Sequence, residues 1–136
     1  MNECVFCNII NGNIPSYKIY EDEDFISFLD IAPATKGHVL IVPKKHMENL
    51  IDMDDELLKK VLILSKKIVK ALKKVYSFND FNIIQNNGEL SGQTVNHFHL
   101  HIIPRYGKTE LGLWTPHEKD ESVNNDYALK IKNELN

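Results

Sequence analysis

The chain has 136 residues, of which 43% are apolar and 26% are charged, and its formal net charge is -3. This length suits one domain with a core that needs no disulfide bonds. The slight negative charge argues against broad nucleic-acid binding, which depends on Lys and Arg. No apolar run approaches the roughly 20 residues of a membrane span, and the N-terminus does not resemble a secretory signal. We therefore expect a cytoplasmic protein that acts on small molecules.

Both cysteines of the chain lie in one Cys-x-x-Cys motif, at Cys4 and Cys7. In a reducing compartment this motif indicates a metal site or a redox pair. A redox pair would follow a strand, and only three residues precede Cys4. Two thiolates are half of a tetrahedral zinc site, so histidines elsewhere would have to complete it. Zinc is the favoured interpretation, and a free dithiol is the alternative.

The apolar pattern before residue 44 predicts three short strands. Residues 17–20 and 25–29 flank an acidic segment and predict a hairpin. A turn over residues 31–37 leads to a third strand at 38–42, which is rich in Val and Ile and ends at Pro43.

Residues 54–76 predict one long helix, because their apolar side chains recur at helical spacing. Acidic residues lie in its first turn and lysines in its last turn, which suits the helix dipole. The remaining lysines occupy the face opposite the apolar stripe. We interpret that face as solvated, and a basic docking patch is the alternative.

The second half of the chain predicts two further strands and a terminal helix. The strands are expected at residues 80–85 and 96–104, and the helix at 124–135. Three strands, one helix and two strands do not alternate as βαβ units do, so the class is α+β with a mainly antiparallel five-stranded sheet. No linker divides residues 1–136, which we expect to form one domain with a C-terminal tail at 107–136.

The expected strand 96–104 carries three alternating histidines, His97, His99 and His101. Side chains alternate between the two faces of a strand, so these imidazoles would share one face while the apolar residues between them enter the core. A purely structural row would need a hydrogen-bond partner for each ring. Two functional alternatives remain: ligands of a catalytic metal, or a nucleophilic imidazole oriented by its neighbours.

A polar loop at residues 86–94 immediately precedes the histidines. Gly88 and Gly92 would allow backbone N–H groups to approach a ligand, and Gln93 and Thr94 add donors, as a phosphate site requires. A plain hairpin turn uses the same residue types. Because no carboxylate cluster for magnesium accompanies the loop, phosphate chemistry here would favour a nucleophilic histidine.

Residues 97–103 match the His-φ-His-φ-His-φ-φ motif of the histidine triad family, where φ is apolar, and the chain resembles the Hint-like microbial branch of that family. The resemblance implies the family's α+β fold, with shorter helices near both ends besides the long one. Matching segments occur in the family's order at 4–10, 29–31, 37–46, 91–94 and 97–103.

The resemblance implies hydrolysis or transfer of nucleotides through a covalent intermediate. His99 would attack the α-phosphorus, and water would then release the nucleoside monophosphate. The attacking nitrogen must be unprotonated, so the other ring nitrogen should donate to a backbone carbonyl. His101 would steady the phosphate or the leaving group. His38 would contact the site residues without contacting the substrate itself.

The resemblance also implies a set of substrate-binding residues. Asn86, Gln93 and Thr94 would lie at the phosphate, and Asp30 would accept hydrogen bonds from the ribose hydroxyls. Without the resemblance, Asp30 is equally typical of a turn. The nucleoside pocket would be lined by Phe28, Leu29 and Ile31.

By the same resemblance the metal site is a closed structural zinc site with Cys4, Cys7, His46 and His97 as ligands. Residues 1–12 would then be a zinc-binding N-terminal segment. Four protein ligands leave no position for a reacting water, so this zinc would stabilise the fold. The sequence alone also allows His46 to be an ordinary exposed histidine.

The expected activity is hydrolysis of dinucleoside polyphosphates or nucleoside phosphoramidates, with adenosine favoured by analogy. His101 differs from the glutamine of the uridylyltransferase branch, which favours hydrolysis. Residues 113–117 do not match the animal form. Family members are typically homodimers whose sheet continues across the interface. The rival functions are a nucleotide-binding module without turnover and a metal-dependent hydrolase that uses the three histidines as ligands.

Overall fold

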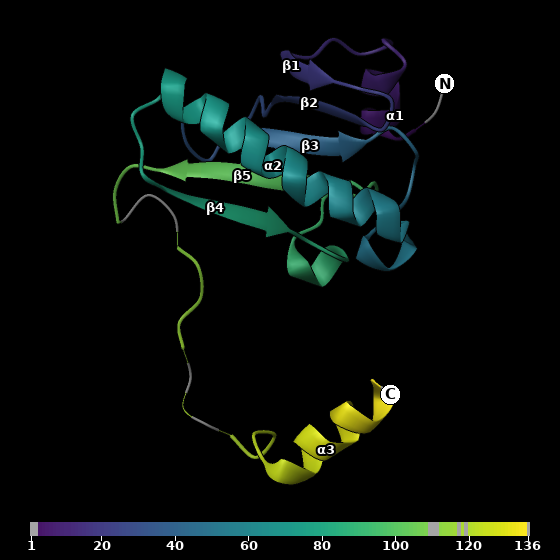
Figure 1. The fold of residues 1–136 in the computed structure, drawn as a ribbon, viewed down its shortest axis with the longest axis vertical. Coiled ribbons are helices and arrows are strands. Elements are labelled where there is room, and N and C mark those ends of the chain that lie inside the picture. Colours follow the sequence, from purple (N-terminus) through teal and green to yellow (C-terminus); the bar gives the residue numbers. More distant parts are fainter. Residues whose placement is uncertain (1–2, 109–111, 117, 119, 136) are drawn as a thin grey trace.

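A five-stranded antiparallel sheet forms the centre of the computed structural model, which describes residues 3–108, 112–116, 118 and 120–135. The strand order is β1-β2-β3-β5-β4 (Figure 1). This arrangement confirms the predicted α+β class. The strands are β1 (Lys18–Glu21), β2 (Phe25–Leu29), β3 (Val39–Pro43), β4 (Asp80–Gln85) and β5 (Leu100–Arg105).

Three α-helices accompany the sheet: α1 (Val5–Ile10), α2 (Asp55–Val75) and α3 (Asn125–Glu134). Two short 3-10 turns, Leu50–Asp52 and Glu89–Ser91, lie in the connections. The bounds of α2 and α3 agree with the predicted helices to within one residue at each end. Among the described residues, no helix is long and apolar enough to cross a membrane.

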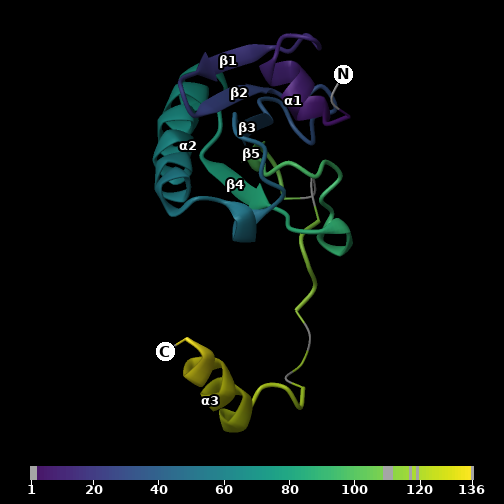
Figure 2. The same cartoon turned by 90° about the vertical axis from the view of Figure 1, so that its right-hand side faces the viewer.

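The long helix α2 covers one face of the sheet (Figure 2). Its apolar stripe, which includes Val61, Leu64 and Ile68, packs in one buried cluster with Val39, Ile41 and other strand residues. The apolar side of the predicted amphipathic helix therefore faces the core, as expected. The lysines on its opposite side are exposed, as a solvated face requires.

The N-terminal helix α1 packs against the opposite face of the sheet, over strands β2 and β3. Phe6 of α1 packs in a second buried cluster with Ile26, Phe28, Leu40 and Val42. Residues 39–42 of β3 therefore alternate between the two clusters, and every residue of the strand is buried. This double burial explains why β3 is an unbroken apolar run.

The last strand, β5, is shorter than the predicted strand at 96–104. Leu100, its first residue, lies opposite Ile41 of β3 and Gln85 of β4. Because β4 ends at Gln85, residues 96–99 have no strand on that side to pair with. The N–H of Phe98 donates instead to the carbonyl of Met47 at 2.6 Å. The predicted alternation survives, since Phe98, Leu100 and Ile102 all enter the α2 cluster.

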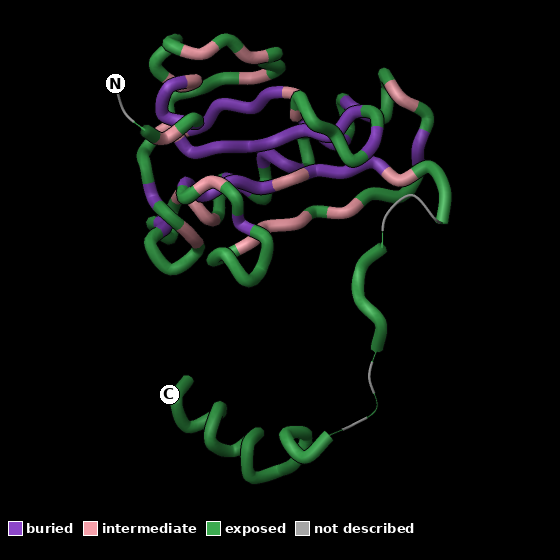
Figure 3. The backbone as a smooth tube through the Cα atoms, turned by 180° about the vertical axis from the view of Figure 1, so that it is seen from behind, coloured by how far each residue is buried: buried purple, intermediate pink, exposed green. Residues whose placement is uncertain are grey.

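The C-terminal tail lies apart from the sheet, as the views in Figures 1 and 2 show. Every described residue from 120 to 135 is exposed, including all of α3 (Figure 3). Asn124 caps α3, because its side chain accepts a hydrogen bond from the N–H of Tyr127. Residues 1–2 of the predicted zinc-binding segment, and 109–111, 117, 119 and 136 of the predicted tail, lie outside the described residues.

Candidate functional site

A cavity of about 270 Å³ opens on the α1 face of the sheet. The strand register builds its floor, because Phe28 of β2 lies opposite Leu40 of β3, which lies opposite His101 of β5. Seven of the residues predicted for catalysis and substrate binding line this cavity: Phe28, Leu29, Asp30, Ile31, Thr94, His99 and His101. Sequence segments far apart in the chain thus converge on one concave site.

His99 is buried at the edge of this cavity, just before β5 begins. Its Nδ1 lies 2.8 Å from the carbonyl oxygen of His97, so Nδ1 must donate a proton to that oxygen. The neutral ring then carries its lone pair on Nε2. Burial lowers the pKa of His99, while the His97 carbonyl and Asp30 oppose this effect. A buried, neutral imidazole with a free Nε2 lone pair is suited to nucleophilic attack.

His101 and His38 form a hydrogen-bonded pair beside His99. His38 Nε2 lies 2.9 Å from His101 Nδ1, and the rings of His99 and His101 are 4.9 Å apart. Burial, together with charge repulsion from His99 and His38, lowers the pKa of His101 to about 4. Burial also lowers the pKa of His38, against the attraction of Asp30. These rings are therefore neutral near pH 7.

Asp30 joins the end of β2 to this histidine pair. Its Oδ1 accepts a hydrogen bond from the N–H of Ala32 at 2.8 Å, as a turn residue would. Its Oδ2 lies 3.5 Å from His38 Nε2, and the residue also lines the cavity. Asp30 therefore makes the turn contact that the sequence allowed and also lines the cavity, and its contact with ribose stays a prediction.

The loop before His97 contributes to the cavity through Thr94, while Gln93 is turned inward. Gln93 is buried, and its Nε2 donates to the carbonyl of Glu48 at 2.6 Å. Its Oε1 accepts from the N–H of Gly88 at 2.7 Å. Gln93 thus ties two loops together in this structure. The predicted phosphate contacts of Asn86 and Gln93 stay predictions.

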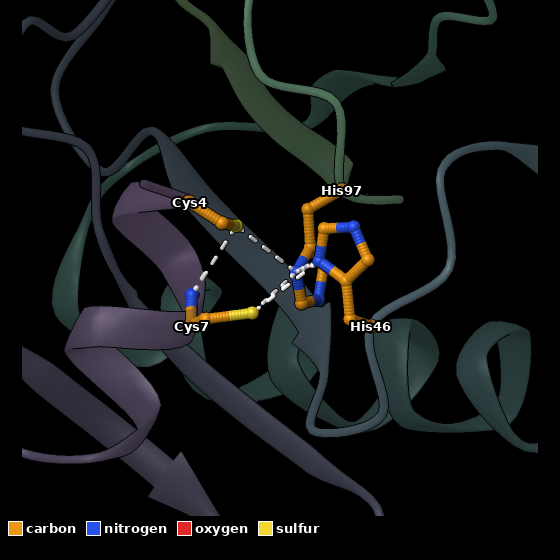
Figure 4. Close-up of side chains that lie close together, drawn as sticks. All are labelled: Cys4, Cys7, His46 and His97. Carbon is orange, nitrogen blue, oxygen red and sulfur yellow. Dashed lines mark hydrogen bonds between the residues drawn. The ribbon is translucent and has the colours of Figure 1, made fainter. Parts of the chain in front are cut away.

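Four predicted metal ligands converge at the other end of the site: Cys4, Cys7, His46 and His97 (Figure 4). The sulfur of Cys7 lies 3.3 Å from His46 Nδ1 and 3.6 Å from His97 Nδ1. The two Nδ1 atoms are 3.0 Å apart, and Cys4 Sγ is 3.4 Å from His97 Nδ1. With Zn–S bonds of about 2.3 Å and Zn–N bonds of about 2.0 Å, the ligand atoms of a tetrahedral zinc are about 3.3–3.8 Å apart. The three sulfur–nitrogen distances lie in this range and the two nitrogens are slightly closer, so the arrangement suits one small ion.

The orientation of His97 separates this cluster from the cavity. Its Nε2 donates to the carbonyl of Pro43 at 2.8 Å, and its Nδ1 faces the cysteines. In the described part of the chain, the other group that could hold a metal consists of Asp30, His38 and His101. The metal-dependent hydrolase alternative requires the three triad histidines to converge on one point. They do not, because His97 belongs to one group and His101 to the other.

Sequence reasoning missed the contribution of α1 to the cavity. Phe6 packs its ring edge-on against His99, with the centroids 4.9 Å apart, and against Phe28 at 5.8 Å. Val5 and Ile9 of the same helix also line the cavity. The available signal was the apolar pair between the two cysteines, of which Phe6 is buried.

Comparison with known proteins identifies the family. The HIT domain model matches residues 11–108. The chain belongs to the HIT family. Its HIT relatives include the protein hit of Bacillus subtilis, which is 47% identical over 119 residues, or 86% of this chain and 82% of that protein. Adenosine 5'-monophosphoramidase hnt1 of Schizosaccharomyces pombe is 38% identical over 95% of this chain and 98% of its own length.

Solved structures of HIT proteins have the same fold. A HIT family member from Bacillus subtilis has a TM-score of 0.86 and 42% sequence identity, covering 98% of this chain and 95% of that one. A histidine triad nucleotide-binding protein from Candida albicans has a TM-score of 0.83 and 38% identity, covering 98% and 94%. The strand order and helix positions described above are therefore those of a HIT protein.

The lowered pKa of His101 predicts how the stability of the protein depends on pH. An unfolded histidine binds its proton near pH 6.5, whereas folded His101 does so near pH 4. The unfolded state therefore binds more protons between these values, and stability falls as the pH drops from 6.5 towards 4. Urea unfolding measured across this range should give a shallower fall for His101→Gln than for the wild type. Equal slopes would contradict the assignment.

Proposed function

We propose that this chain is a nucleotide hydrolase that cleaves at the α-phosphate of nucleoside phosphoramidates or dinucleoside polyphosphates. The observation that carries the proposal is the bond from His99 Nδ1 to the His97 carbonyl, which leaves the Nε2 lone pair for attack. The name of the fission-yeast relative, an adenosine 5'-monophosphoramidase, supports hydrolysis of an adenosine phosphoramidate. The Candida albicans structure, named for nucleotide binding, supports the substrate class.

The reaction has two displacement steps at phosphorus. In the first, His99 Nε2 forms a bond to the α-phosphorus, and the bond to the leaving group breaks with its electron pair on the leaving atom, where a departing amine nitrogen takes up a proton from solvent. In the second, water attacks phosphorus and loses one proton to solvent, and the electron pair of the N–P bond returns to Nε2, which releases the nucleoside monophosphate. The nucleotidyl-imidazole keeps a proton on Nδ1 and is cationic, so the His97 carbonyl stabilises it throughout.

The apolar part of the cavity suits the nucleoside. Phe6, Phe28 and Ile31 offer flat or branched apolar surface for a base, and Asp30 offers a carboxylate at the ribose end. Adenine is the favoured base, by analogy with the named relative. Thr94 lies in the same lining as both His99 and His101, where its hydroxyl can donate to the phosphate.

His99→Ala should abolish turnover of adenosine phosphoramidate, by at least about 10³-fold, because it removes the nucleophile. Intact-mass analysis of rapidly quenched wild-type protein should show one added nucleotidyl group, absent from the variant. Circular dichroism and nucleotide titration establish that the variant is folded and still binds. Binding without turnover or adduct in the wild type would favour a binding module, and chelator-sensitive turnover without an adduct would favour a metal-dependent hydrolase.

We further propose that Cys4, Cys7, His46 and His97 hold a structural zinc. Two thiols and two imidazole nitrogens are a preferred zinc donor set, and four protein ligands close the site. The bond from His97 Nε2 to Pro43 supports the proposal, because it leaves Nδ1 unprotonated for a metal. A bound zinc would supply a cross-link between the N-terminal helix and the segment before β5. The sequence-based prediction of a cytoplasmic location agrees with the reduced thiols that this site needs.

The zinc proposal predicts a difference between two matched histidine substitutions. His46→Gln should lose zinc, measured as metal per chain by plasma mass spectrometry after dialysis, and should unfold at lower urea concentration. His38→Gln changes a buried histidine outside the ligand set and should retain one zinc per chain. Retention of full zinc by His46→Gln, or its loss from both variants, would contradict the ligand assignment.

We also propose a homodimer in which β4 pairs with β4 of a second copy. Edge strands invite pairing unless they are short, charged or irregular. The edge strand β1 has a register irregularity between Lys18 and Tyr20 and is bounded by charged residues. The other edge, β4, is six residues long, and Phe81 and Ile83 on it are 39% and 40% exposed. Among the described strands β4 pairs with β5 alone, so its outer edge is available.

Substitutions at the two sheet edges test the dimer. Ile83→Asp should shift the molar mass from dimer towards monomer, because it places a charge in the proposed interface. Ile19→Asp on β1, where the side chain is 45% exposed, is the matched control and should leave the dimer intact. Size-exclusion chromatography with light scattering measures both. A monomeric wild type, or equal dissociation of the two variants, would refute the β4 interface.

A further inference from the structure

The exposed side of α2 concentrates positive charge. Residues 57–79 contain seven lysines and no acidic residue. All seven lie on α2 and are exposed: Lys59, Lys60, Lys66, Lys67, Lys70, Lys73 and Lys74. With Asp55 and Glu56 in its first turn, α2 has a formal charge of +5, which leaves -8 for the rest of a chain whose total is -3. The small net charge therefore combines a basic helix with an acidic remainder.

Most of these lysines have no counter-charge on the protein. Lys59 pairs with Glu56 at 2.9 Å, and Lys60 pairs with Asp24 at 2.8 Å. In the part of the chain that the structure describes, the other five lysines of α2 form no ion pair. Like charges four positions apart on a helix repel one another, as Lys66 and Lys70 do. A solvated face requires only exposure, whereas this unbalanced charge indicates a surface that an anionic partner would stabilise.

Two exposed apolar side chains lie among the lysines. Leu62 is 59% exposed and Ile63 is 72% exposed. Residues three or four positions apart share one side of a helix, so Ile63 lies on the same side as Lys66 and Lys70. Ile63 also lines a surface hollow together with four lysines: Lys66, Lys67, Lys70 and Lys74. We call the seven lysines with Leu62 and Ile63 the lysine face, and a partner on it would meet cations around an apolar centre.

The residue types of the lysine face favour a lipid surface over a nucleic acid. The face has no arginine, the residue whose planar group binds phosphates in pairs of hydrogen bonds and stacks on bases. Helix α2 has no aromatic side chain on which a base could stack. At a bilayer, by contrast, lysine ammonium groups reach the headgroup phosphates while neighbouring apolar side chains enter the boundary of the acyl chains.

We propose that the lysine face docks the protein on an anionic phospholipid surface, with Leu62 and Ile63 inserted between the headgroups. Clusters of about four to eight basic residues are typical of surfaces that bind anionic lipids, and each lysine near such a surface raises the affinity about five-fold. Lysine is a flexible point charge, so the attraction requires negative charge and no particular headgroup. This role is separate from the proposed hydrolysis and does not depend on it.

The position of α2 leaves the candidate site accessible on a docked protein. Helix α2 covers one face of the sheet, and the cavity opens on the other face, where α1 packs (Figure 2). The cavity would therefore face away from the lipid. In the proposed β4 dimer the two-fold axis is perpendicular to the continuous sheet, so both α2 helices lie on the same side. Two lysine faces would then contact one flat surface together, which increases the overall affinity.

Co-sedimentation with sucrose-loaded vesicles tests the proposal. The wild type should sediment with vesicles of equal parts phosphatidylglycerol and phosphatidylcholine, less so as salt is added, and should not sediment with pure phosphatidylcholine. Lys66→Gln combined with Lys70→Gln should bind the anionic vesicles about 25-fold more weakly, because two lysines are lost. Lys130→Gln combined with Lys132→Gln makes the same change in net charge on α3 and should bind as the wild type does.

Ile63→Gln tests the apolar part of the lysine face and should weaken vesicle binding by about 10-fold or more, because it removes a side chain from the acyl boundary. Circular dichroism establishes that each variant is folded, which exposed positions allow. A wild type that stays in the supernatant with anionic vesicles at physiological salt would overturn the proposal, as would equal binding by the two double variants or full binding by Ile63→Gln. Tighter binding to single-stranded RNA than to the vesicles, measured by fluorescence polarisation and dependent on Lys66 and Lys70, would overturn it in favour of a nucleic-acid surface.

Discussion

The buried ring of His97 is the contact on which the site depends. Its Nε2 is bound to the carbonyl of Pro43, and its Nδ1 faces the two cysteines. Its own carbonyl accepts the proton of His99 Nδ1. One fully buried residue therefore joins the end of β3, the N-terminal helix and the candidate nucleophile. A shift of His97 would change both its contacts with Cys4 and Cys7 and the orientation of His99.

The packing of the sheet explains why His97 can be held so firmly. Phe98, the next residue, is anchored in the α2 cluster on the opposite side of the chain. Phe6 contacts the rings of both His97 and His99 from the other side. The segment before β5 is not part of the sheet, yet core packing on one side and α1 on the other fix it. Preorganisation here depends on both hydrophobic clusters, since neither alone contacts both sides of the segment.

The sequence predicted most of the fold because its strongest patterns are local. The period of α2 and the apolar run of β3 are visible in single segments, and the triad motif and Cys-x-x-Cys pair specify chemistry at fixed spacing. The predicted start of the last strand, at residue 96, was wrong because strand pairing is non-local. The strand begins at Leu100, opposite Gln85, where β4 ends. The inward turn of Gln93 and the place of Phe6 in the cavity likewise depend on contacts with distant segments, Glu48 and His99.

The side chains of the triad are alike, so any difference in their hydrogen bonding must come from their surroundings. The Pro43 carbonyl acts on Nε2 of His97, the His97 carbonyl on Nδ1 of His99, and the Ala34 amide on His101 through His38. A backbone carbonyl always accepts and a backbone N–H always donates, whatever side chain the residue carries. Proline at position 34 is the exception, because it has no N–H. The sequence motif therefore specifies which rings are present, while the backbone groups around them specify which nitrogen of each ring carries a proton. A histidine triad placed on an unconstrained strand would lack these fixed proton positions.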